Sequence, residues 1–119
     1  MNPIKQQITI AEACDWFGIE NHNGLSAFGS WKGYHPEHAN SIGSPQPIPE
    51  YLNDLNAMYE AEKVLTDGQA YQYRRWLQIL AVKYQAGREI YGSVGFEFFA
   101  TAPQRAEAFL RTIGKWEET

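Results

Sequence analysis

Three threonines in this 119-residue sequence are each followed, three positions later, by a glutamate or a glutamine. The pairs are Thr9 with Glu12, Thr66 with Gln69, and Thr101 with Gln104. In such a capping box the threonine hydroxyl accepts a hydrogen bond from the backbone N–H of the later residue, whose side chain reaches back to the threonine N–H. Each pair precedes apolar residues at helical spacing, so the sequence predicts three helices.

The helix after Thr101 is the most fully specified. Pro103 falls in the first turn, where no intrahelical N–H is lost, and Gly114 follows the last apolar residue as a cap. The apolar stripe comprises Ala106, Phe109, Leu110 and Ile113. All local signals agree, which is typical of a structural element, and they indicate no chemistry.

The first box predicts a short helix that begins at Thr9 or earlier, near Pro3, and stops at Gly18. Its apolar face comprises Ile10, Ala13, Cys14 and Phe17. The helix after Thr66 is longer and is expected to end at Gly87. Its apolar residues are Tyr73, Trp76, Leu77 and Leu80; a strand also fits the local alternation, but the length and the cap favour a helix.

A fourth helix is expected from Pro49 and Glu50 through Lys63. Its apolar side comprises Leu52, Leu55, Met58, Tyr59 and Leu65. The best strand material is "REIYGSVGFEFFA", and "LSAFGSW" could supply a second short strand. The stretch 20–48 is rich in Gly and Pro, contains all three His, and is predicted to be a long loop.

The fold expected from these elements is α+β, with about four helices packed on a small antiparallel sheet in one domain, 1–119. The net charge of −4 argues against binding of duplex nucleic acid. No apolar segment is long enough to suggest a membrane helix or a signal peptide. The lone Cys14 favours a reducing cytoplasm.

Catalytic candidates are weak. His35, Glu37 and His38 lie close in sequence but lack a third metal ligand at a defined spacing, and surface-loop histidines are the simpler interpretation. Cys14 falls on the expected buried face of its helix. The acidic residues Glu60, Glu62 and Asp67 fit a solvated face. With no established catalytic motif present, we expect a non-enzymatic protein without cofactor or metal, and keep a hydrolase using the two histidines and Glu37 as a remote alternative.

Two stretches combine aromatic rings with positive charge, "WKGYH" and "YRRW". A guanidinium beside aromatic rings suits a nucleotide, because the base stacks and the phosphate is paired. The candidate ligand-binding residues are Trp31, Tyr34, Arg74, Arg75, Trp76 and Arg88. The alternative is structural: Trp76 belongs to the core, and the two adjacent arginines pair with Glu60 or Glu62 on a wet face.

Two stretches, "PEYLNDLNAMYEAEKVLTDGQ" and "ATAPQRAEAFLRTIGKW", resemble a family of small phage and prophage proteins with the phage α-β-α (ABA) sandwich domain. The N-terminal segment Ala11 to Trp16 is similar to that family too. The resemblance covers less than half of the chain, and its matched residues are caps and apolar stripes. It implies a sandwich-like fold and a phage-encoded protein in the cytoplasm of an infected bacterium, and it carries over no catalytic residue.

Two functions follow as hypotheses. One is a non-enzymatic protein that counteracts host anti-phage defence by sequestering a small anionic, nucleotide-type signal, as a homo-oligomer with pockets at subunit boundaries. The other is an inhibitor that binds a host defence or nucleic-acid-processing protein, either through the loop 20–48 or by presenting an acidic helix that mimics nucleic acid.

Overall fold

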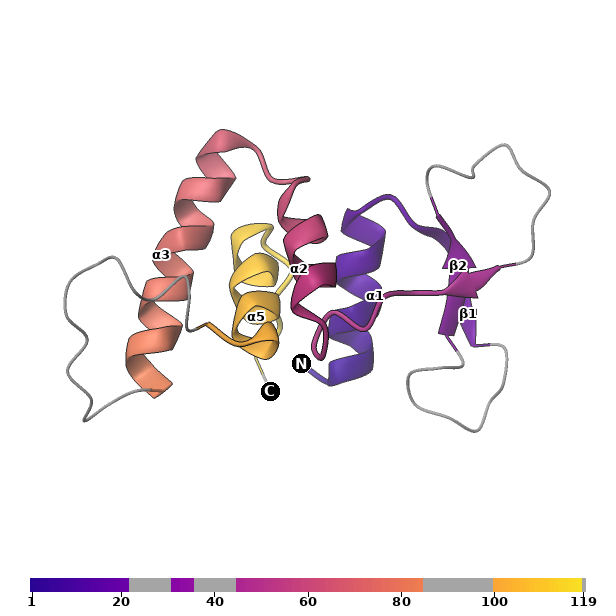
Figure 1. The fold of residues 1–119 in the computed structure, drawn as a ribbon, viewed down its shortest axis with the longest axis horizontal. Coiled ribbons are helices and arrows are strands. Elements are labelled where there is room, and N and C mark those ends of the chain that lie inside the picture. Colours follow the sequence, from indigo (N-terminus) through magenta and orange to yellow (C-terminus); the bar gives the residue numbers. More distant parts are fainter. Residues whose placement is uncertain (22–30, 36–44, 85–99, 119) are drawn as a thin grey trace.

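A computed structural model describes residues 1–21, 31–35, 45–84 and 100–118, and Figure 1 draws the rest as a thin grey trace. The predicted strand "REIYGSVGFEFFA" lies outside the described residues except for its last alanine, and so do Gly87 and most of "LSAFGSW". The described residues form four helices: α1 Pro3–Ala13, α2 Leu55–Glu62, α3 Asp67–Tyr84 and α5 Ala102–Thr112.

The strands form one small antiparallel sheet in the order β1-β2-β3. They are β1 Phe17–Asn21, β2 Trp31–Tyr34 and β3 Gln46–Pro47. Strand β1 pairs with β2 from Phe17 opposite Tyr34 to Asn21 opposite Trp31, with an irregularity between Phe17 and Glu20. Within the stretch 20–48 that is predicted to be a long loop, the described residues Glu20, Asn21, Trp31–Tyr34 and Gln46–Pro47 belong to paired strands.

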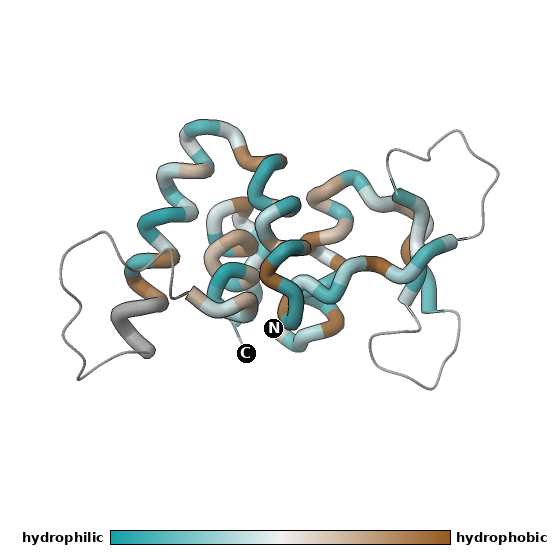
Figure 2. The backbone as a smooth tube through the Cα atoms, viewed as in Figure 1, coloured by the Kyte–Doolittle hydropathy of each residue, from teal (hydrophilic) through white to brown (hydrophobic). Residues whose placement is uncertain are grey.

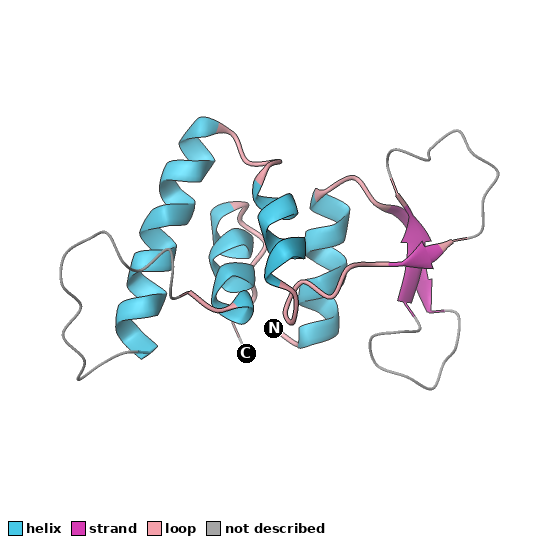
Figure 3. Cartoon of the chain, in the orientation of Figure 1, coloured by secondary structure: helices cyan, strands magenta, loops and turns pink. Residues whose placement is uncertain are grey.

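Helix α5 lies at the centre of the helical group and packs against α1, α2 and α3. Figures 1 and 3 show α3 at one end of the molecule and the sheet at the other, beyond α1. The predicted α+β class, with about four helices and a small antiparallel sheet in one compact domain, is confirmed.

The core lies where the helices meet, and hydrophobic segments of the chain face one another there (Figure 2). Three residues of the predicted α5 stripe, Ala106, Phe109 and Leu110, are completely buried. Gly114, which follows the C-cap Ile113, has φ 74°, as the predicted glycine at the helix end requires. Burial of the apolar face of α5 against the neighbouring helices therefore contributes to the stability of the domain.

Two of the three predicted capping boxes are confirmed. Thr101 and Gln104 exchange both hydrogen bonds, at 3.3 and 2.9 Å, and Thr66 and Gln69 do the same at 3.2 and 3.0 Å. The box at Thr9 is wrong, because Asn2 caps α1 and Thr9 lies inside the helix, where its hydroxyl donates to the Lys5 carbonyl. Of the two starts considered for this helix, the structure has the earlier one.

Helix α1 also ends earlier than predicted, at Ala13 rather than at Gly18. Asp15 takes a left-handed conformation with φ 69°, and the Trp16 N–H bonds to the Ala11 carbonyl. These contacts close the helix and bury Trp16. Phe17, expected on the apolar helix face, instead begins β1 and is 44% exposed.

Helix α2 begins five residues later than Glu50, the expected first turn. The carboxylate of Asp54 accepts from the backbone N–H groups of Asn56 and Ala57 and so starts the helix. The Pro49 carbonyl, ahead of this helix, accepts from the Gln7 side chain at 2.9 Å. This hydrogen bond ties α1 to the segment that leads from the sheet into α2.

Candidate functional site

Of the six predicted ligand-binding residues, the five that the structure describes do not form one site within a single chain. Trp31 and Tyr34 belong to β2, whereas Arg74, Arg75 and Trp76 belong to α3. Figure 1 shows these two elements at opposite ends of the molecule. Arg88 lies outside the described residues.

The two rings on β2 have neighbours of their own. Trp31 is half-buried and packs against the hydrophobic core. Tyr34 stacks on Phe17, with 5.3 Å between the ring centroids, and the next residue, His35, meets Trp16 edge-on at 5.1 Å. The Tyr34 contact joins β2 to β1, and the His35 contact joins the end of β2 to the segment after α1, so these rings have structural roles.

Trp76 is half-buried, packs against the core, and is covered by Arg111. The Arg111 guanidinium lies 4.9 Å from the Trp76 ring centroid and 5.2 Å from that of Trp116. It is held in place by Glu107 and Glu118, each 2.8 Å away. Trp76 therefore helps to join α3, α5 and the segment after α5, which is a structural role.

Arg74 does line a pocket, of about 420 Å³, which α2, α3 and α5 form together. The residues that line this pocket are Tyr59, Glu62, Leu65, Ala70, Tyr73, Arg74, Leu77 and Arg105. The neighbouring Arg75 is exposed and does not line it. Arg74 is thus the one predicted site residue that the structure places in this pocket.

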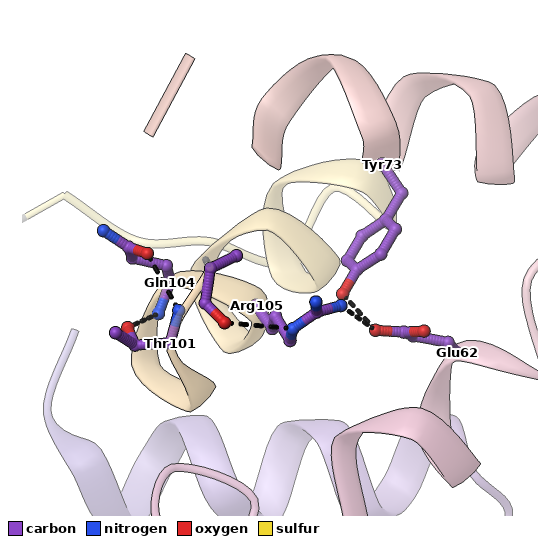
Figure 4. A network of polar contacts seen from close by, with 6 residues as sticks. Glu62, Tyr73, Thr101, Gln104 and Arg105 are labelled. Carbon is purple, nitrogen blue, oxygen red and sulfur yellow. Dashed lines mark hydrogen bonds and ion pairs between the residues drawn. The ribbon is translucent and has the colours of Figure 1, made fainter. Parts of the chain in front are cut away.

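Three polar side chains of the pocket form a network between its helices (Figure 4). The Tyr73 hydroxyl donates to Glu62 Oε1 at 2.5 Å, and Arg105 Nη1 donates to the same oxygen at 2.9 Å. Arg105 Nε also donates to the Ala100 carbonyl at 3.2 Å. The Arg105 side chain is 6% exposed and that of Glu62 is 25% exposed, so this ion pair is largely removed from water.

The network also shifts the pKa values of Tyr73 and Arg105. Burial, together with the Glu62 carboxylate, raises the pKa of Tyr73 well above its usual range, so the hydroxyl remains protonated and donates. Burial acts to lower the pKa of Arg105, but its contacts with Tyr73 and Glu62 outweigh that effect and leave the pKa raised. The ring of Tyr59 lies over the same guanidinium, with 5.0 Å to its centroid.

The acidic residues differ from the sequence prediction. The sequence predicts Glu62 on a solvated face, with Arg74 or Arg75 as its partner in the structural alternative, but Glu62 pairs with Arg105 across the helical group. Glu60 pairs with Lys63 at the surface. The predicted site residues do not include Glu62, Arg105 or Tyr59, whereas Tyr73 belongs to the stretch "YRRW" that the sequence indicates.

A second pocket, of about 470 Å³, lies near the start of α5. It is lined by Gln6, Leu52, Thr101, Pro103, Gln104, Glu107 and Trp116. Its one charged residue, Glu107, is paired with Arg111, and Thr101 and Gln104 are paired with each other. This arrangement offers less for recognition of a charged ligand than the pocket at Arg74.

Among the described residues, no group of three or more His, Cys, Asp and Glu side chains is placed to hold a metal ion. Glu37 and His38 lie outside them, so the histidine site remains an untested alternative. Burial raises the pKa of the Cys14 thiol, despite a hydrogen bond with Tyr51 that lowers it, and a protonated thiol is a poor nucleophile.

Comparison of the chain with models of known protein families, with curated proteins and with solved structures finds no match. The resemblance to phage ABA sandwich proteins therefore stays a prediction. In the described part of the chain, no helix has both the length and the apolar character needed to cross a membrane.

Proposed function

We propose that this protein is a non-enzymatic binding protein that captures a small anionic ligand of nucleotide type in the pocket between α2, α3 and α5. The observation that carries the proposal is the position of Arg74, which lines a pocket that also contains the Tyr59 and Tyr73 rings and Arg105. Arginine pairs with phosphate oxygens, and aromatic rings stack on flat bases.

Charge supports the same proposal. Among the described residues that line the pocket, Arg74 and Arg105 are positively charged and Glu62 is negatively charged. The whole chain carries −4. Arginines in the pocket of an acidic protein favour a small anion there, while the acidic surface repels extended polyanions.

The biological role that we propose rests on the resemblance to phage proteins. The protein would be made in the cytoplasm of an infected bacterium and would remove a nucleotide-type signal on which a host defence depends. Sequestration requires no turnover, which agrees with the expectation of a non-enzymatic protein. Homo-oligomerisation remains part of this proposal, and native mass spectrometry would report the subunit number together with any co-purified ligand.

Titration calorimetry with nucleoside monophosphates and cyclic nucleotides tests the pocket. We expect Arg74→Gln to weaken the binding of whichever ligand binds by about tenfold or more, because a charge-assisted contact is lost. Arg75→Gln is the matched control, since it removes the same charge from the adjacent, exposed position. An equal effect of the two substitutions, or no binding by any nucleotide, would contradict the proposal.

A second candidate function is inhibition of a host defence or nucleic-acid-processing protein. The observation that favours it is the exposed Phe17 ring, stacked on Tyr34 at the end of the molecule away from the pocket. An aromatic pair of this kind is a common anchor in protein interfaces. If it acts here, Phe17→Ser reduces formation of a complex with the host protein, whereas Arg74→Gln leaves that complex unchanged.

A further inference from the structure

Helix α3 carries a line of exposed side chains on the face opposite its buried side. Its described buried residues are Tyr73, Leu77 and Leu80. Residues spaced four apart follow one another along a helix face, and one such row is exposed throughout. We call this row the outer stripe, and its members are Asp67, Tyr71, Arg75 and Ile79. Because α3 lies at one end of the molecule, the outer stripe lies at the edge of the domain (Figure 1).

The outer stripe has opposite charges on the two sides of an aromatic ring. Asp67 lies one turn before Tyr71, which is 63% exposed, and Arg75 lies one turn after it. Neither charged side chain forms an ion pair with any residue that the structure describes. Eight positions of one helix separate the two by about 12 Å of rise, so they do not pair with each other. The stripe therefore offers an anion and a cation, each without a described partner.

This arrangement is complementary to itself. When two copies of α3 pack antiparallel, a two-fold axis at Tyr71 brings the two Tyr71 rings together. The same axis places Asp67 of each copy opposite Arg75 of the other, because both residues are four positions from Tyr71. One stripe thus supplies an aromatic pair and two ion pairs. Rows of residues four apart are also the ridges through which helices most often pack.

Partners of a single charge fit the outer stripe less well. A polyanion or an anionic membrane surface would pair with Arg75 but would meet the Asp67 carboxylate one turn beyond the ring. A strongly basic surface would pair with Asp67 and repel Arg75. A second copy of the chain satisfies both residues at once, and charge complementarity therefore favours it as the occupant.

We infer that α3 is a homodimer interface, in which Asp67 of each copy pairs with Arg75 of the other beside a Tyr71 pair. This gives the homo-oligomer of the proposed function a contact surface, but it needs no ligand and stands apart from the pocket. One helix face is smaller than a standard interface of about 800 Å² per partner, so the dissociation constant should be on the order of 100 µM.

Sedimentation equilibrium at protein concentrations up to about 1 mM, well above that dissociation constant, tests the interface. The unaltered protein should form dimers. Asp67→Lys and Arg75→Glu should each raise the dissociation constant by about tenfold or more, because each sets like charges against each other twice across the two-fold axis. Glu12→Lys is the control, since it changes the net charge as Asp67→Lys does at an exposed position of α1, and it should leave the dissociation constant unaltered.

Mixing the two weakened variants gives the sharpest test. A copy with Asp67→Lys and a copy with Arg75→Glu present opposite charges at both pairs, so the mixture should dimerise within about threefold of the unaltered protein. Circular dichroism verifies that both variants keep their helix content. A monomer at every concentration, a dimer that neither substitution weakens, or a mixture of folded variants that stays monomeric would overturn the inference. None of these results bears on ligand capture, which calorimetry measures separately.

Discussion

Glu62 and Arg105 stand 43 positions apart in the sequence, and their side chains meet at 2.9 Å between α2 and α5. The guanidinium is almost fully buried, and the carboxylate balances its charge at close range. Removing one member of a buried ion pair leaves the other desolvated without compensation, which is more costly than the pair itself is favourable.

We therefore expect Glu62→Ala to lower the free energy of unfolding by about 3 kcal/mol. Urea denaturation followed by circular dichroism measures the change. Glu60→Ala removes the same charge at an exposed position, where the pair with Lys63 is solvated, and should change stability by less than about 1 kcal/mol. Similar changes for the two variants would show that the buried pair contributes no more to the free energy of unfolding than the exposed pair does.

The helix caps give a second prediction. Thr101→Ala removes the acceptor for the Gln104 N–H and should destabilise the protein by about 1 kcal/mol. Thr9→Ala should have little effect, because Thr9 lies within α1 and alanine is the better helix former there. Thermal unfolding of both variants distinguishes the two cases, and a loss of about 1 kcal/mol at Thr9 would mean that the helix begins at Thr9 after all.

A third prediction concerns the approach of β1 to β2. A Cβ atom at Gly33 would lie 2.9 Å from Ile19 Cγ1 and 3.1 Å from the Phe17 carbonyl oxygen, so Gly33→Ala should cost about 1–3 kcal/mol. Gly68→Ala is the control, because nothing lies within 4 Å of the added carbon and the residue is in α3. That variant should be neutral or up to about 1 kcal/mol more stable. Chemical denaturation of both variants measures these changes. An unchanged free energy of unfolding in Gly33→Ala would contradict the close approach of β1 and β2 at Gly33.

The fourth prediction is a pH dependence at the alkaline side. The pKa of Tyr73 is higher in the folded protein than in the unfolded chain, so above about pH 10 the unfolded chain releases this proton first. The contribution of Tyr73 to stability is therefore complete below about pH 10 and decreases above it by about 1.4 kcal/mol per pH unit.

Urea denaturation between pH 9 and 11 measures this slope. Tyr73→Phe should reduce the slope of the free energy of unfolding against pH by up to about 1.4 kcal/mol per pH unit. The control Tyr71→Phe changes an exposed tyrosine on the same helix and should leave the slope unaltered. An unchanged slope in Tyr73→Phe would show that this hydroxyl ionises equally easily in the folded and unfolded states.

Helix caps and apolar helix faces could be predicted from the sequence, because they depend on residues only a few positions apart. The boxes at Thr66 and Thr101 join residues three apart, and the buried stripe of α5 repeats within one helix. The same pattern at Thr9 does not start a helix, because Asn2 and Pro3 form an equally good start about two turns earlier. A local pattern permits a cap, but competing caps nearby decide which one is used.

The pocket could not be predicted in the same way. Its polar network joins Glu62, Tyr73 and Arg105, and only the packing of three helices brings them together. Arg74 and Arg75 are indistinguishable in the sequence, yet the rotation of α3 places only the first in the pocket. Trp31 and Tyr34 share the composition of a nucleotide site with "YRRW", but composition does not report that β2 and α3 lie at opposite ends.

The packing of α1 against α5 has a consequence for biosynthesis. These are the first and last helices described, and the core that includes Ile10 and Phe109 needs both of them. About 90 residues separate the end of one from the start of the other, so at roughly 5–20 residues per second the ribosome needs roughly 5–20 s to span them. For that interval the apolar face of α1 has no partner helix to cover it, and the nascent chain is open to chaperones and to aggregation.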